Sequence, residues 1–161
     1  LHSRQVDLAL VSTSRRADAD DVVWTEPLVW AGRQPTFELC DLGDTVPLAL
    51  SPSNTMDQKA ACEAMSRAGR PYRISHVSSS LAGLVAVIRS GLAIGVMTRQ
   101  AVPPDLHVLG DPLPPLPTLG MMIAESGQSP AARAFGQHAR KVLRRLIGSS
   151  FELSHSYGRN R

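Results

Sequence analysis

Hydroxyl and amide side chains follow two apolar segments of this 161-residue chain, each time just before a stretch with helical periodicity. The first group contains Ser53, Asn54 and Thr55, and the second is the serine triplet 78–80. Such side chains cap helices. They also donate hydrogen bonds to anions at helix N-termini, where backbone N–H groups are free and the partial charge is positive. Both groups are therefore compatible with plain helix starts and with contacts to a small anion such as a carboxylate.

Catalytic motifs are not evident around these groups. The serine triplet lacks the G-x-S-x-G pattern of a nucleophile elbow, and the chain contains no H-E-x-x-H, Walker A or G-x-G-x-x-G sequence. His76 precedes Ser78 by two residues, which on a strand makes them neighbours on one face but does not establish a catalytic pair. The two cysteines, Cys40 and Cys62, do not form a C-x-x-C motif. We expect no catalytic residue, no metal ion and no cofactor.

Composition predicts a folded chain with an aliphatic core. Hydrophobic residues make up 43% and aromatic residues only 4%, which is enough apolar material for one compact domain or two small lobes. The net charge of +3 is concentrated at the end of the chain. From Arg133 onward there are seven basic residues, and Glu152 is the only acidic residue in that segment of the sequence. That basic segment fits a contact with nucleic acid or another subunit, and it equally fits a solvated helix face. The longest apolar run, residues 81–88, is shorter than the ~20 residues of a membrane span.

The order of expected elements predicts an α/β fold with a parallel sheet. Apolar and alternating segments indicate strands at 6–11, 22–32, 46–50, 72–77, 92–97, 106–110 and 116–124. Helices are expected from Thr55 to about residue 68, from 81 to 90, and from Pro130 to Gly148, with the apolar 81–90 helix buried against the sheet. Alternating strands and helices between 46 and 97 imply three parallel strands. Their carboxyl ends should then bring both polar groups to one edge of the sheet, where ligands bind in such folds.

Residues 6–146 resemble the C-terminal effector-binding domain of LysR-type transcriptional regulators. The segments VDLAL, SSSLAGLVAVIRSGLAIGVM and SPAARAF carry this resemblance through their order and spacing. It implies a two-lobed type 2 periplasmic-binding-protein-like fold with a small effector in the inter-lobe cleft. Lobe I would hold residues 1–30 and 98–148 and would be incomplete, because its opening strand and helix are absent; lobe II would hold 31–97. Residues 149–161 would form a polar tail.

The resemblance also implies a binding site and partners. Its effector contacts correspond to Ser53, Asn54, Thr55 and Thr98, and the helix-end argument adds Ser78 and Ser79. The expected partners are a small carboxylate, DNA through an N-terminal helix-turn-helix absent from this chain, and copies of itself in a cytoplasmic homodimer or homotetramer. The chain begins with Leu1 and is expected to belong to a longer protein. Without its opening part, we expect exposed apolar surface around VDLAL and on the last helix.

Two other functions remain open at this point. A solute-binding protein of a transport system would have the same fold, and it would require a secretory signal upstream of this chain. An enzyme on the same scaffold is also conceivable because fold does not fix function, but no residue set in the sequence supports one.

Overall fold

The computed structural model describes residues 6–14, 21–35, 45–125 and 129–157, with side chains as far as residue 145. The chain forms two compact units: Leu1–Thr25 with Leu119–Arg161, and Glu26–Thr118. It passes between them inside strand β2 (Val22–Gly32) and at the start of strand β7 (Thr118–Glu125). The predicted lobes divide the chain elsewhere, at 30/31 and 97/98, and they remain a prediction.

The larger unit is built on a mixed sheet in which strand β3 (Val46–Leu50) is the middle one of three parallel strands. On one side of β3 lies parallel strand β4 (Tyr72–Val77), and on the other lies parallel strand β5 (Ile94–Thr98). Strand β2 runs antiparallel to β5, and short strand β6 (His107–Leu109) pairs with β2. The three parallel strands and the α/β class predicted from the sequence are confirmed.

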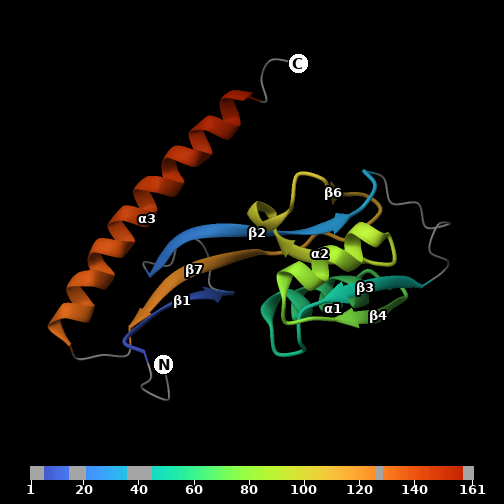
Figure 1. Cartoon of the computed structure of the whole chain (residues 1–161), viewed down its shortest axis with the longest axis horizontal. Helices are drawn as coiled ribbons and strands as arrows, with labels where there is room; N and C mark the ends of the chain where they lie inside the picture. Colours follow the sequence, from blue (N-terminus) through green and yellow to red (C-terminus); the bar gives the residue numbers. More distant parts are fainter. Residues whose placement is uncertain (1–5, 15–20, 36–44, 126–128, 158–161) are drawn as a thin grey trace. The chain divides into compact units, whose positions relative to one another are not determined.

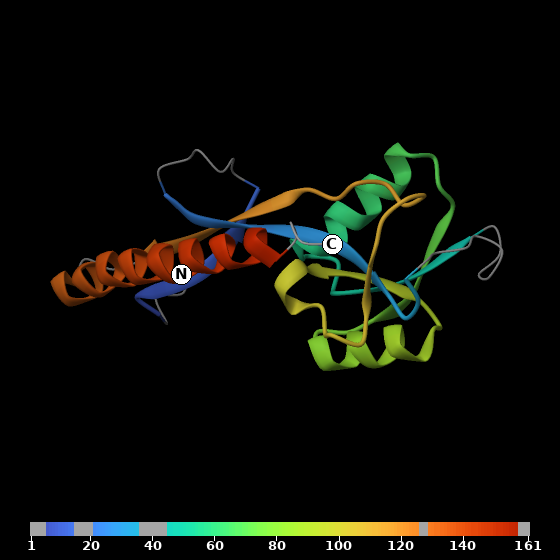
Figure 2. The same ribbon diagram turned by 90° about the horizontal axis from the view of Figure 1, so that it is seen from above.

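Two helices cover opposite faces of this sheet. Helix α1 (Met56–Arg67) connects β3 to β4, and helix α2 (Leu81–Ser90) connects β4 back across β3 to β5. The first connection therefore runs in one direction along the sheet and the second in the other. Two crossovers of the same hand then place their helices on different faces. Figures 1 and 2 show α1 and α2 with the strands of the larger unit between them.

Helix α2 is buried against the sheet, as the sequence predicts, and it buries one face only. Leu84, Val85 and Ile88 join a core with Ala49 and Met97 from the sheet. On the opposite side of the helix, Ala82 and Ala86 are exposed. A single sheet face can cover only the helix stripe that contacts it, whatever the composition of the other side.

Glycines end both helices, as the sequence predicts. Gly69 follows α1 with a φ of 62°, and Gly91 follows α2 with a φ of 77°. This left-handed conformation closes the last turn, and it strains any residue with a Cβ. On α1 the residues Ala60, Ala61, Ala64 and Met65 have helical spacing and form one buried face. Ala68 continues this apolar pattern in the sequence but is exposed, because it lies after the helix end.

The smaller unit pairs strand β1 (Leu8–Thr13) with β7 in antiparallel register, and it contains helix α3 (Pro130–Tyr157). At the start of α3, the Ala132 N–H donates to Ser129 Oγ over 3.5 Å, so Ser129 caps the helix. The helix continues through Gly148, where it was predicted to stop, so most of the predicted polar tail is helical. A glycine inside a helix costs only about 1 kcal/mol relative to alanine, and no proline follows to end the helix.

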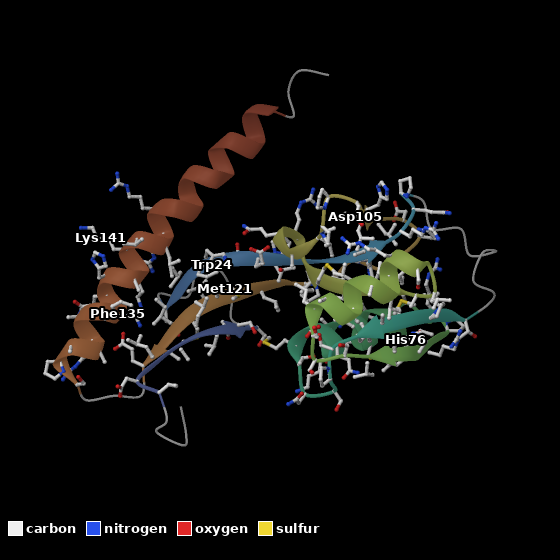
Figure 3. The ribbon with its side chains drawn as sticks, viewed as in Figure 1. Trp24, His76, Asp105, Met121, Phe135 and Lys141 are labelled. Atoms are coloured by element: carbon white, nitrogen blue, oxygen red, sulfur yellow. The ribbon has the colours of Figure 1, made fainter. Side chains whose placement is uncertain are left out.

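Apolar side chains of this unit remain exposed, as expected for VDLAL and the last helix. Val6 and Leu10 are about half exposed, and Phe135 on α3 is 64% exposed (Figure 3). Helix α3 instead approaches the strands through Gly136, which is buried. A Cβ on Gly136 would meet Glu125 Oε1 at 2.6 Å, so the helix lies close to β7 at this point. Among the described residues, no helix has both the length and the apolar composition that a membrane crossing requires.

Candidate functional site

Both predicted polar groups lie at the carboxyl edge of the sheet, meaning the edge where β3, β4 and β5 end. The segment after β3 leads into α1, and the segment after β4 leads into α2. A backbone hydrogen bond joins the two segments, since Ser78 N–H donates to Leu50 O over 3.1 Å. The two neighbouring strands send their following helices to opposite faces, an arrangement that opens a crevice for ligands in α/β sheets. The structure therefore brings the two helix starts together, as predicted.

The start of α1 leaves its first backbone donors free for a ligand. Thr55 is the N-cap residue, but its hydroxyl donates backwards to Pro52 O over 2.7 Å and makes no cap bond to the helix. Thr55 and Gln58 have the spacing of a capping box, but the Thr55 side chain does not form its half of one. The first intrahelical bond runs from Lys59 N–H to Thr55 O, so the three preceding N–H groups point out of the helix end. Ser53 and Asn54 are exposed beside them.

The start of α2 has the same character. Ser80 is the N-cap residue and makes no side-chain cap bond, and the first helical bond runs from Leu84 N–H to Ser80 O. The Ser78 hydroxyl is occupied locally: it donates to Ser80 O and accepts from Ser80 N–H, both over 3.1 Å. Ser79 is exposed, and within the described residues its side chain has no hydrogen-bond partner. In the triplet, Ser78 thus stabilises the turn, Ser80 is the N-cap residue, and Ser79 has a hydroxyl available for a ligand.

Electrostatics differ between the two helix starts. The first turn of α1 contains Asp57, whereas the first turn of α2 has no acidic residue. A carboxylate near a helix N-terminus stabilises the helix, but it also repels an anionic ligand from the same amides. The charge of Asp57 alone thus makes the start of α1 less favourable for an anion than the start of α2.

Thr98 and a buried carboxylate extend the edge on the other side of β3. Thr98 ends β5, is half-buried, and begins a short 3₁₀ turn, η2 (Arg99–Ala101). On the adjacent strand, Glu26 is 6% exposed, and its Oε1 accepts the N–H of Gln100 over 3.2 Å. Sequence reasoning did not select Glu26. Its one signal was an acidic residue inside the otherwise apolar segment 22–32.

His76 does not form a pair with Ser78. Its Nδ1 lies 3.0 Å from the hydroxyl of Ser75, which donates its proton to Leu48 O over 3.1 Å. The Ser75 oxygen can then only accept, so the Nδ1 of His76 is the donor. This chain of bonds lies where the β3–β4 register shifts between Leu48 and Ala49, and it satisfies a backbone oxygen at the irregularity. Among the described residues there is also no group of three or more His, Cys, Asp or Glu side chains placed to hold a metal ion.

Comparison with known proteins places the chain in a family. A model described as the LysR substrate binding domain matches residues 1–144. The HTH-type transcriptional regulator DgdR of Burkholderia cepacia is 48% identical over 147 residues, which cover 89% of this chain and 49% of DgdR. The chain thus spans about half the length of that relative.

Two solved regulatory domains have a similar fold. The apo form of the HypT regulatory domain from Salmonella typhimurium has a TM-score of 0.68 at 16% identity, over 91% of this chain and 76% of that one. The CcmR regulatory domain of Synechocystis PCC6803, in complex with 2-PG, has a TM-score of 0.66 at 16% identity, over 88% of this chain and 76% of that one. At such identities the likeness concerns the fold, which agrees with the predicted type 2 periplasmic-binding-protein-like class. On the family match over residues 1–144, this chain belongs to the LysR substrate-binding domain family.

Proposed function

We propose that this chain is the effector-sensing domain of a bacterial LysR-type transcriptional regulator. The family match over residues 1–144 carries the proposal, and the 48% identity to a named HTH-type transcriptional regulator supports it. The alternative role in solute transport is not favoured, because that relative is a regulator. The family assignment also agrees with the expectation that the chain is not an enzyme.

The proposed effector is a small carboxylate bound at the carboxyl edge of the sheet. Free N–H groups at the starts of α1 and α2 supply the positive ends of two helices. The bond from Ser78 N–H to Leu50 O holds these two starts beside each other. A small molecule is the kind of ligand present in the solved CcmR regulatory domain, whose complex contains 2-PG.

The six proposed site residues divide into two roles. The hydroxyl groups of Thr55 and Ser78 donate hydrogen bonds to Pro52 O and Ser80 O, so these two residues stabilise the turns before the helices. The other four have side chains without a hydrogen-bond partner among the described residues and are proposed to contact the effector directly: Ser53, Asn54, Ser79 and Thr98.

The regulatory step is proposed to be a shift between conformations. An effector that binds one arrangement of the domain better than another raises the population of that arrangement. A homodimer or homotetramer in the cytoplasm would transmit the change to helix-turn-helix domains, and a symmetric dimer would match paired half-sites on DNA. The relative DgdR extends well beyond the matched region, which leaves room for such a DNA-binding part.

A thermal-shift screen of small carboxylates on the purified full-length protein tests the site. A ligand at 100 times its Kd adds about 2.7 kcal/mol to stability, which raises the melting temperature by several degrees. The double variant Ser79→Ala, Thr98→Val should lose most of this shift. The control Ser66→Ala, which removes an exposed hydroxyl on the far turn of α1, should retain it. Equal shifts in all three proteins would refute the assignment of these residues.

A second experiment tests the regulatory role. Full-length protein should retard DNA from the promoter region beside its own gene, and the active carboxylate should change that affinity. Failure to bind this DNA more tightly than an unrelated fragment of equal length, at matched salt, would contradict a role as a specific regulator.

A further inference from the structure

Resting on the proposed effector site, we infer that the effector carries a positively charged amino group as well as a carboxylate, and that Glu26 binds the amino group. The ligand class is thus an α-amino acid or a close zwitterionic relative. Glu26 is a binding residue that neither the sequence motifs nor the helix-start argument selects.

The first support is a largely buried glutamate that has no cationic partner among the described residues. Glu26 is only 6% exposed. Its one hydrogen-bond donor among the described residues is the neutral N–H of Gln100, at 3.2 Å, and no described cationic side chain pairs with it. A buried charge is costly unless a partner of opposite sign or several donors compensate it. A ligand ammonium group would supply that compensation.

The second support is the position of Glu26 at the same edge as the helix starts. Strand β2 is antiparallel to β5, and Leu28 is paired with Thr98. Leu28, the first residue of β2 that pairs with β5, therefore lies beside Thr98, the last residue of β5. Glu26 precedes Leu28 by two residues, so it lies at the carboxyl edge and beyond the last pair.

The third support is the face of the sheet that Glu26 shares. Met97 and Ala31 belong to the core beneath α2. Side chains alternate along a strand, so Thr98, next to Met97, belongs to the opposite face, which is the face of α1. Leu28 is directly opposite Thr98, so the two side chains are on the same face of the sheet. Glu26 is two residues before Leu28 on the same strand, and its side chain therefore points to that face as well. Glu26 and the first turn of α1 therefore lie on one face at one edge.

The separation matches a short zwitterion. Strand β5 lies between β2 and β3, so the strand that holds Glu26 is two strand spacings, about 10 Å, from the strand that leads into α1. An amino group and a carboxylate on one carbon are about 3 Å apart, and a hydrogen bond at each end adds about 3 Å. A ligand of this size can reach both partners without a long spacer.

Matched pairs of ligands that differ only in the amino group test this inference. Suitable probes are L-alanine with propionate, L-valine with 3-methylbutanoate, and L-glutamate with glutarate. Binding to full-length protein is measured by calorimetry for the wild type, for Glu26→Gln and for the control Glu63→Gln, an exposed carboxylate on α1. The wild type and the control should prefer the amino member of at least one pair by about tenfold or more, and Glu26→Gln should abolish that preference while still binding the plain acid.

The outcomes separate this inference from the proposed function. If carboxylates bind but the amino group brings no preference, or if Glu26→Gln keeps the preference, the inference is wrong and the anion site stands. If no plain carboxylate and no amino acid binds, the inference and the proposed site both fail.

A ligand-free measurement provides an independent check. Glutamine keeps an oxygen for Gln100 N–H and removes the charge, so Glu26→Gln should melt at the same temperature as the wild type or higher. A fall of several degrees would show that Glu26 already has a cationic partner within the protein, which overturns the inference.

Discussion

The guanidinium of Arg89 forms a two-point ion pair with the carboxylate of Asp105, with Nε–Oδ2 at 2.5 Å and Nη2–Oδ1 at 2.7 Å. Arg89 lies in the last turn of α2, and Asp105 lies between η2 and β6 (Figure 3). The pair therefore ties the end of α2 to the segment that leaves β5. Both side chains are about half exposed, so solvent screens the attraction.

This ion pair predicts a small loss of stability in acid. The hydrogen bond from Arg89 holds the pKa of Asp105 below its ordinary value, and it outweighs the opposite effect of desolvation. A carboxyl with a lowered folded-state pKa stabilises the fold above its unfolded pKa, and this contribution is lost as pH falls through the folded value. Asp105→Asn should therefore lower the melting temperature slightly at pH 7 and in low salt, and the difference from the wild type should vanish in strong acid or at 1 M salt. A difference that persists unchanged at 1 M salt would exclude an electrostatic origin.

Gly95 is predicted to be the least replaceable glycine under α2. A Cβ there would lie 2.5 Å from Ile88 Cδ1 and 3.1 Å from the backbone oxygen of Ala49. Gly95→Ala should cost about 1–3 kcal/mol of unfolding free energy, because α2 must move away from the sheet. Gly110→Ala is the matched control, since its added Cβ would have no atom of a described residue other than its chain neighbours within 4 Å. Urea unfolding of both variants measures the difference, and equal stabilities would contradict the packing described for α2.

Ser78 and Ser79 should separate stability from ligand binding. Ser78→Ala removes two local hydrogen bonds with Ser80 and should cost about 0.5–1.5 kcal/mol. Ser79→Ala removes an exposed hydroxyl and should leave the melting temperature unchanged within a degree, while weakening binding of the carboxylate found by the screen. Thermal melts with and without that carboxylate distinguish the two effects. The reverse pattern would show that the two roles have been exchanged.

Asp57 is predicted to favour the helix at the expense of the ligand. Its carboxylate is in the first turn of α1, where it stabilises the helix by about 0.3–1 kcal/mol. Asp57→Asn should lower stability by that order and tighten binding of an anion, because a like charge near the site is removed. Calorimetric titration at low salt measures the second effect, and unchanged binding by the variant would place the anion away from α1.

The sequence predicted most of the elements because their signals are local. Alternating and apolar runs identified β3 and β4 with their observed bounds, and Gly69 and Gly91 marked the ends of α1 and α2. The parallel order of β3, β4 and β5 followed from the alternation of strands with helices. That order was enough to bring the two polar groups to one edge.

The remaining features depend on contacts that no local pattern contains. The exposed side of α2 could not be foreseen, because composition does not say which face the sheet covers. The split roles of Ser78 and Ser79 depend on hydrogen-bond geometry within one turn. Glu26 was missed because a single acidic residue in a strand gains meaning only from its burial and from its place beside Thr98.

Backbone amide shifts in a ¹⁵N-labelled sample, recorded while the screened carboxylate is titrated in, test the central claim most directly. The largest changes are expected at the free N–H groups of the two helix starts, notably Asp57 and Gln58 in α1 and Ala82 and Gly83 in α2, together with Ser79. Changes confined to residues elsewhere, with these amides unmoved at saturation, would contradict an effector site at the carboxyl edge of the sheet.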